Sequence, residues 1–246
     1  MLKNLEHFGR YVTLLAQIFH RPENFRMYWN ELFRQMNAVG IESIPIVGVV
    51  SIFIGAVTAL QFAYQVQEFA VPLYYLGYIV RDTMVIEMAP TMTCLMLAGK
   101  VGSNMASELG NMRISEQINA LEIMGVNTPG YLIGTKVLAT FITVPSLIIL
   151  SAILGILGGL IAVLATGVAS FGDYERGLHA FFMPYNVTMM FVKGAVFAFV
   201  LSSIACYQGY TVKGGAIQIG EASTRAVVLS DILILVSDYI IAEILL

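Results

Sequence analysis

Residues 131–168 read YLIGTKVLATFITVPSLIILSAILGILGGLIAVLATGV, a stretch of 38 residues in which Lys136 is the only charged side chain. A helix needs about 20 apolar residues to cross a bilayer, because lipid offers no hydrogen-bond partner to an open backbone. The stretch contains no polar turn at which the chain could reverse. We therefore expect one long or tilted transmembrane helix rather than two short ones.

The whole chain has the composition of a membrane protein. Apolar residues make up 58% of the 246 positions and charged residues only 12%, against about 45–50% and 25% in soluble domains. This predicts an all-α integral membrane protein with a single membrane domain over residues 44–246. The five predicted spans are residues 44–66, 76–101, 131–168, 187–207 and 226–246. A net charge of −3 argues against a nucleic-acid partner, because nucleic-acid binding needs a basic surface.

Residues 1–43 have the pattern of interfacial amphipathic helices. Apolar residues recur at helical spacing before and after a turn signal at Arg21-Pro22-Glu23-Asn24, and the only Trp, Trp29, belongs to the second series. Such helices can lie at the headgroup level of the membrane. The alternative is that they pack on the cytoplasmic ends of the spans.

Basic residues predict the orientation of the chain, since short cytoplasmic segments are enriched in Lys and Arg. An N-terminus inside the cell leaves only Arg81 and Arg176 on the outer side, with Lys193 inside the fourth span. The other basic residues then lie on the cytoplasmic side: Lys3, Arg10, Arg21, Arg26, Arg34, Lys100, Arg113, Lys136, Lys213 and Arg225. Five crossings place the C-terminus outside.

A polar segment, SELGNMRISEQINALEIM at residues 107–124, separates the second and third spans. Ser115 is followed by Glu116 and Gln117, which favours a helix start capped by Ser115. Ile118 and Leu121 fall on one side of the predicted helix. Such a helix can lie on the membrane or fit a groove on a soluble partner.

This segment closely resembles the signature of the MlaE-type permease family of ABC lipid transporters. The matching residues are Glu108, Leu109, Gly110, Met112, Arg113, Ile114, Ser115, Glu116, Gln117, Ile118, Ala120, Leu121 and Met124. The sequences AGKVGS at residues 98–103 and ASTRAVV at residues 222–228 resemble two further family motifs, with Lys100 where the family has Arg. The resemblance runs from about residue 40 to the end.

The resemblance implies the permease subunit of a transporter that moves phospholipid between the inner and outer membranes of a bacterium. It further implies a homodimer in the inner membrane, bound to ATPase subunits that hold ATP and Mg and to a periplasmic MCE-domain protein. Residues 107–124 would be the coupling helix that seats in the ATPase. The coupling residues it implies are Glu108, Met112, Arg113, Glu116, Gln117 and Leu121. The chain itself contains no G-x-x-x-x-G-K-[ST] motif, so no nucleotide cofactor is expected to bind it through a P-loop.

Charged residues inside the predicted spans are candidates for function, because a charge in the bilayer is costly unless it is paired or lines a cavity. Glu87, Lys193 and Asp238 qualify, and Pro90 predicts a helix kink next to Glu87. Lys193 can neutralise Glu87 or Asp238 in a structural pair, or these residues can line the lipid path. A proton relay is a third use of such groups.

Glycines in the first and third spans, such as Gly55 and Gly155, permit close backbone approach between helices.

Two other classes of function remain open. A stand-alone secondary transporter usually contains an internal repeat that forms a site at the midplane, and we find none in this sequence. An intramembrane enzyme needs a nucleophile and a base at a suitable spacing. Copurification of an ATPase subunit would separate these alternatives from an ABC permease.

Overall fold

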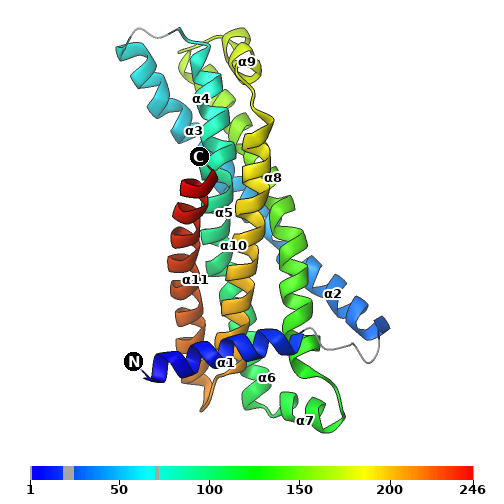
Figure 1. Ribbon diagram of the computed structural model, residues 1–246. Coiled ribbons are helices and arrows are strands. Elements are labelled where there is room, and N and C mark those ends of the chain that lie inside the picture. Colours follow the sequence, from blue (N-terminus) through cyan, green and yellow to red (C-terminus); the bar gives the residue numbers. More distant parts are fainter. Residues whose placement is uncertain (1, 19–24, 70–71, 246) are drawn as a thin grey trace. The chain divides into compact units, whose positions relative to one another are not determined.

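The computed structural model describes residues 2–18, 25–69 and 72–245, and these residues form helices and no strand (Figure 1). This confirms the predicted all-α class. The α-helices are α1 (Leu2–Ile18), α2 (Phe25–Val39), α3 (Ile44–Glu68), α4 (Tyr75–Thr83), α5 (Ala89–Leu97), α6 (Ser103–Ile114), α7 (Gln117–Ile123), α8 (Thr135–Thr166), α9 (Phe171–His179), α10 (Pro184–Tyr210) and α11 (Ala216–Leu245). The predicted turn at Arg21–Asn24 lies outside the described residues.

Four helical stretches of the described chain are long and apolar enough to cross a membrane, which identifies the protein as a multi-pass membrane protein. They are Phe25–Val66, Tyr75–Ile114, Pro129–Thr166 and Pro184–Tyr210. Each overlaps one of the first four predicted spans. The second runs 13 residues beyond the predicted end at Val101, and the third ends at Thr166, two residues before the predicted end. The fifth predicted span lies within α11, a helix of 30 residues that carries too many charges to qualify by composition. Its crossing of the membrane remains a prediction.

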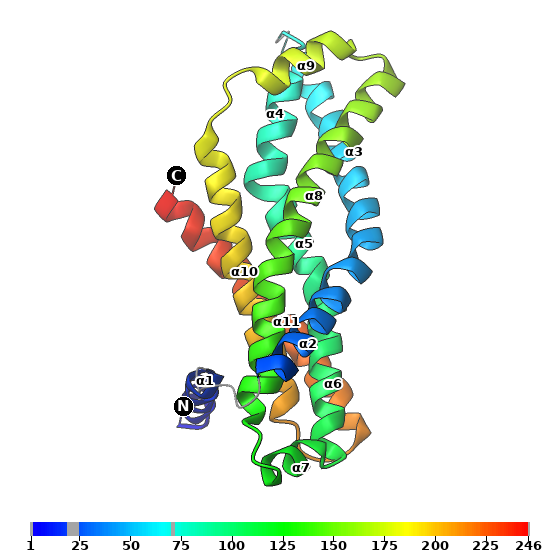
Figure 2. The ribbon, with the colours of Figure 1, turned by 90° about the vertical axis from the view of Figure 1, so that its right-hand side faces the viewer.

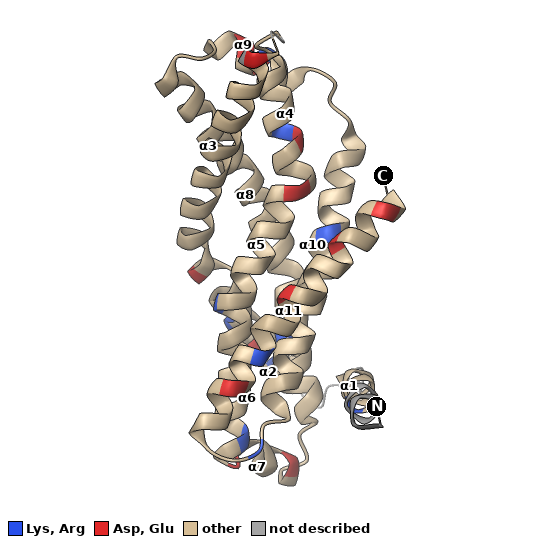
Figure 3. Ribbon diagram, turned by 90° about the vertical axis from the view of Figure 1, so that its left-hand side faces the viewer, with Lys and Arg blue, Asp and Glu red and all other residues tan. Residues whose placement is uncertain are grey.

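Charged side chains are unevenly distributed among the helices. They are rare along α3 and gather around α6 and α7 (Figure 3). A helix face without charges can meet lipid, whereas a charged segment needs water or a partner. The stretch around α6 and α7 is therefore suited to a position outside the bilayer.

Three short π-helices interrupt the long helices, and the sequence patterns did not predict them. They are η2 (Met84–Met88), η3 (Ala98–Gly102) and η4 (Pro129–Gly134); one 3-10 turn, η1 (Ile41–Ser43), precedes α3. The wider turn of a π-helix is uncommon and is often found at functional sites. The first of the three, η2, contains Glu87.

The chain forms two compact units, and α5, α8, α10 and α11 contribute to both. Unit 1 comprises Met1–Ile41, Cys94–Thr143 and Val196–Ile240, and unit 2 comprises Glu42–Thr93, Val144–Ala195 and Ile241–Leu246.

Unit 2 has a core formed mainly by small and aliphatic residues of α3, α4 and α8, together with Tyr174 of α9. The Tyr174 hydroxyl donates to the Ile156 carbonyl at 3.0 Å. A side chain at Gly55 would overlap the backbone of Gly155, so these glycines allow α3 and α8 to approach closely. The Ser51 hydroxyl also donates to Ser151 across the same pair of helices, at 2.8 Å.

Unit 1 packs α6 against α10 and α11. A side chain at Gly209 would meet the backbone carbonyl oxygen of Ala106 at 2.5 Å. The Ser107 and Ser223 hydroxyls are 2.8 Å apart, and Ser223 also donates to the Ser103 carbonyl at 2.7 Å. These contacts fix the start of α11 beside α6.

The two predicted N-terminal amphipathic helices are α1 and α2. In α2, the aromatic residues Phe25, Trp29 and Phe33 are exposed, as expected for a helix that inserts apolar side chains into the membrane surface. α1 lies across α10 (Figures 1 and 2) and contacts it through Tyr11, whose hydroxyl donates to Ser203 at 2.8 Å. Burial raises the pKa of Tyr11, which keeps its hydroxyl protonated as a donor.

Candidate functional site

Glu87 lies in the π-helix η2, directly before Ala89 and Pro90. Proline has no backbone N–H, so Pro90 cannot donate the helical hydrogen bond to the carbonyl four residues earlier. The π-helix η2 ends at Met88, two residues before Pro90, and the helix kink at Pro90 stays a prediction. This wider turn sets the direction in which the Glu87 side chain leaves the helix.

Lys193 of α10 forms an ion pair with Glu87, with 2.6 Å between Nζ and Oε2. The Lys193 side chain is fully buried, whereas 43% of the Glu87 side chain is exposed. Glu87, one of the two acids predicted as partners of Lys193, thus forms an ion pair with it. A bound group that approaches this pair meets the carboxylate first.

Asp238, the third intramembrane charge singled out from the sequence, lies on α11 and is buried. It belongs to unit 1, whereas Glu87 and Lys193 both belong to unit 2.

Arg81 and Asp82 form a second ionic group in unit 2, which the sequence analysis did not assign to a site. The Arg81 guanidinium pairs with Asp82 at 2.7 Å and donates to the carbonyls of Leu178 and Ala180 at 2.5 and 2.9 Å. It also lies over the rings of Tyr78 and Phe182. Arg81 therefore holds the loop after α9 against α4. The signal for this role in the sequence was a lone Arg near two groups of aromatic residues.

The segment predicted as one coupling helix, residues 107–124, is two helices. Its first part is the end of α6, and its second part is the short helix α7. Ser115 ends α6 instead of capping a new helix, and its hydroxyl donates back to the Asn111 carbonyl at 2.7 Å. Glu116 adopts a left-handed conformation, with φ of 59°, which breaks the helix. A new helix does begin close to the predicted start, at Gln117, but the predicted cap is wrong, because Glu116 holds the cap position and Ser115 ends α6.

Glu108, one of the implied coupling residues, is partly exposed and pairs with residues of its own chain. It forms an ion pair with Lys136 of α8, whose side chain is buried, and lies 3.5 Å from Arg34 of α2. The lone lysine of residues 131–168 thus has a carboxylate partner. A single charge in an apolar stretch signals such a partner, but the sequence did not identify which acid it is.

Polar contacts attach α7 to the end of α10. The Tyr210 hydroxyl lies 3.1 Å from Glu122 and 2.9 Å from Thr128, and Thr128 donates to the same Glu122 carboxylate at 3.0 Å. The Arg113 guanidinium lies over the Tyr210 ring at 5.6 Å and donates to Asn119 at 3.0 Å. Movement of α7 would therefore be transmitted to α10 through Tyr210. Sequence reasoning missed Tyr210, Glu122 and Thr128.

The remaining coupling candidates differ in exposure. Glu116 and Gln117 are exposed, Met112 and Leu121 are half-buried, and Asn119 donates to the Glu116 carboxylate. The most exposed apolar residues of this region are Ile123 and Met124, at 87% and 68%. Two adjacent apolar side chains this exposed are suited to contact with another molecule. The glycine that follows, Gly125, has a φ of 85° and ends α7. A glycine at this position is a sequence signal for the end of a helix, and Ile123 and Met124 lie at that end.

Known proteins resemble this chain along most of its length. The family model described as Permease MlaE matches residues 32–244. A probable ABC transporter permease protein of Rickettsia bellii is 35% identical over 88% of this chain and 83% of the relative. The intermembrane phospholipid transport system permease protein MlaE of Haemophilus influenzae is 30% identical over 94% of this chain and 88% of the relative. A chloroplastic protein of Arabidopsis thaliana, TRIGALACTOSYLDIACYLGLYCEROL 1, is 27% identical over 96% of this chain.

Proposed function

The chain belongs to the MlaE permease family, and we propose that it is the transmembrane subunit of an ABC transporter that moves phospholipid between membranes. The observation that carries this proposal is the family match over residues 32–244. The matched residues include most of the first membrane-spanning stretch, all of the other three and the α6–α7 segment. The Haemophilus influenzae relative is named as a phospholipid transport permease. We place the protein in the inner membrane on the same grounds.

The transporter needs an energy source outside this chain. Its relatives are named as ABC transporter permeases, and the sequence contains no P-loop. We propose that a separate ATPase subunit binds ATP and Mg, and that two copies of this chain and a periplasmic MCE-domain protein complete the assembly.

We propose that α7 and the residue after it seat in the ATPase. The exposed tip of Ile123 and Met124 supplies apolar contact area, and Gln117 and Glu116 supply polar groups beside it. The contacts of Tyr210 with Glu122 and Thr128 would carry a displacement of this tip into α10, the helix that bears Lys193. The coupling path proposed here is therefore α7, Tyr210, α10.

The Glu87–Lys193 pair is our candidate for contact with the lipid path. Its carboxylate is partly exposed in an otherwise apolar helix, and charged residues in such positions usually mark a transport pathway. The pair has no net charge, so it can stay in the membrane when no lipid is bound.

Replacement of Ile123 and Met124 by Ser tests the docking of α7. The two side chains contact little of their own chain, so the variant should fold, insert and dimerise as the wild type does. Apolar side chains at the centre of an interface commonly contribute about 2 kcal/mol or more to association. We expect the ATPase to be lost on copurification and lipid-stimulated ATP hydrolysis to fall.

A matched control is Ile244→Ser, which removes an exposed apolar side chain at the far end of α11 in sequence. This control should retain the ATPase. Full ATPase retention by the Ile123→Ser, Met124→Ser variant would show that α7 lies on the membrane surface and would contradict the coupling role. Arg113 and Glu116 are poorer probes, because their contacts with Asn119 stabilise α7 itself.

A further inference from the structure

Unit 1 contains a basic pocket beside α1. α1 is amphipathic and lies across α10 (Figures 1 and 2). Its contact with α10 is specific, because Tyr11 bonds to Ser203 and its ring meets the Tyr207 ring edge to face at 5.5 Å. An amphipathic helix that crosses the spanning helices in this way marks the level of the membrane surface.

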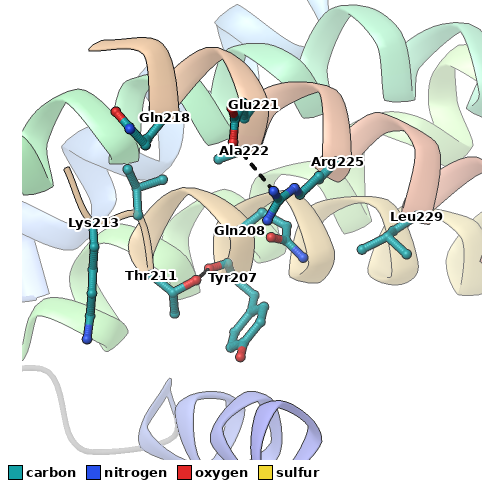
Figure 4. Close-up of a pocket in the computed structure, with 10 residues that line it drawn as sticks. Tyr207, Gln208, Thr211, Lys213, Gln218, Glu221, Ala222, Arg225 and Leu229 are labelled. Carbon is teal, nitrogen blue, oxygen red and sulfur yellow. Dashed lines mark hydrogen bonds and ion pairs between the residues drawn. The ribbon is translucent and has the colours of Figure 1, made fainter. Parts of the chain in front are cut away.

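Two adjoining cavities lie next to this contact, and they share Tyr207, Thr211, Val212 and Lys213. The first has a volume of about 470 Å³ and is lined by residues of α1, including Arg10, and by Arg113. The second has a volume of about 440 Å³ and is lined by the start of α11, including Glu221 and Arg225 (Figure 4). We call the two cavities together the basic pocket.

The basic pocket has an excess of positive charge. Among the described residues that line it, four are basic (Arg10, Arg113, Lys213 and Arg225) and Glu221 alone is acidic. Glu221 forms an exposed ion pair with Arg225 at 3.4 Å, which contributes little in water. Arg113 contacts the Asn119 amide and the Tyr210 ring, both of which are neutral. An anion in the pocket would therefore meet several cations and one carboxylate.

An exposed apolar stripe begins where the basic pocket ends. Leu229, which lines the pocket, is one helical turn beyond Arg225, and Ile232 and Val236 continue the same face of α11. Their side chains are 41%, 51% and 48% exposed in the chain. A basic pocket at the level of the membrane surface, followed by an apolar stripe along a helix, matches the two ends of a phospholipid.

We propose that the basic pocket binds the phosphate of an anionic phospholipid headgroup, with the acyl chains along Leu229, Ile232 and Val236. Basic pockets between membrane helices bind such headgroups, and each Lys or Arg at the surface adds to the attraction. The inference does not rest on the proposed transport function, since it uses neither Glu87 nor Lys193. A free phosphate carries the same charge but gains nothing from the apolar stripe.

The test compares lipid retention by two variants that each lose two positive charges. The wild-type protein, purified from vesicles of mixed phosphatidylcholine and phosphatidylglycerol, should carry phosphatidylglycerol in excess over the vesicle composition, as measured by mass spectrometry. Arg10→Gln with Lys213→Gln should reduce this enrichment by roughly tenfold or more. The control, Arg26→Gln with Arg176→Gln, removes exposed basic residues outside the pocket and should retain it.

Equal enrichment in both double variants and the wild type would overturn the proposal. If the Arg10 variant does not fold, Lys213→Gln alone provides the test, because Lys213 lies exposed in the loop before α11. Loss of the ATPase with unchanged lipid retention would assign the pocket to a protein partner instead. This outcome would leave the phospholipid transport function standing.

Two further arms separate the source of the phosphate. Leu229→Asn with Ile232→Asn should reduce phosphatidylglycerol retention, and inorganic phosphate should not displace the lipid from the wild type. Displacement by inorganic phosphate would identify a free-anion site. A change in oligomeric state in the Leu229→Asn, Ile232→Asn variant, with lipid retention unchanged, would show that a second copy of the chain covers the stripe.

Discussion

Two lysines in apolar helices, Lys136 and Lys193, each form an ion pair with a glutamate, Glu108 and Glu87 respectively. An ammonium group in a low-dielectric environment is costly unless a carboxylate accompanies it. In both pairs the lysine is buried and the glutamate is partly exposed. Removal of the glutamate and removal of the lysine should therefore destabilise the protein by different amounts.

Glu87→Gln should destabilise the protein more than Lys193→Met does. The first change removes the carboxylate from a fully buried ammonium, whereas the second leaves a glutamate whose side chain is 43% exposed at the surface of the chain. Loss of one partner of a buried pair costs about 3–5 kcal/mol, so we expect up to about 3 kcal/mol for Glu87→Gln and less for Lys193→Met. Thermal unfolding of the purified protein measures both, and lipid transport should fall in both.

The double variant of Glu87 and Lys193 should lose less stability than the sum of the two single losses, since neither charge is then left behind. Glu221→Gln, which alters an exposed carboxylate, serves as the control and should change stability little. Strictly additive losses would contradict the pairing.

Glu108→Gln should destabilise the fold, in addition to any effect on the coupling role that the family resemblance implies for Glu108. The change leaves the buried Lys136 without its carboxylate. We expect a loss of about 3 kcal/mol, and Lys136→Met in the same chain should restore part of it. Glu116→Gln is the matched control, because Glu116 is exposed. An equal effect of both substitutions on the unfolding temperature would refute this role.

At the scale of elements, the apolar lengths in the sequence predicted the four spanning stretches, but not how the helices end or bend. Hydrophobic length reports which residues can meet lipid, and it is insensitive to one extra residue in a helical turn. The π-helix at Glu87 and the break at Glu116 depend on backbone geometry. The intramembrane charges were likewise visible in the sequence, whereas the choice of Glu87 as the partner of Lys193 depended on the packing of two distant helices.

Two Gly→Ala changes should differ in their effect on stability, because Gly55 lies in the contact between α3 and α8 whereas Gly220 lies in open space. At Gly55 a methyl group would overlap the Gly155 backbone, so Gly55→Ala should destabilise the protein by about 1–3 kcal/mol. At Gly220 in α11 nothing lies within 4 Å of the new methyl group, so Gly220→Ala should be neutral or stabilise by up to about 1 kcal/mol. Thermal unfolding in one detergent compares them, and a stable Gly55→Ala protein would mean that the two helices can separate without cost.

At the scale of the whole molecule, the distribution of basic residues predicts the topology. Whether α11 crosses the membrane decides on which side the C-terminus lies. α11 is the one long helix of the described chain whose charges keep it from qualifying as a span. Two of these charges, Glu221 and Arg225, lie in its first turns before residue 226. Asp238 is buried within the protein, so it does not face lipid. The rest of the helix is long enough, since about 20 residues span the hydrocarbon.

We therefore expect α11 to cross the membrane and the chain to end on the side opposite to α7. A reporter enzyme fused after residue 246 should be active outside the cytoplasm, and one inserted near Asn119 should be active only inside it. The reason is that an N-terminus in the cytoplasm places all but three of the 13 basic residues on the inner side. A cysteine introduced at Asn119 should correspondingly react with a membrane-impermeant reagent only after the cells are opened. Reporter activity of both fusions in the cytoplasm would limit the chain to four crossings and would place α11 on the inner side, where its apolar face would need another partner.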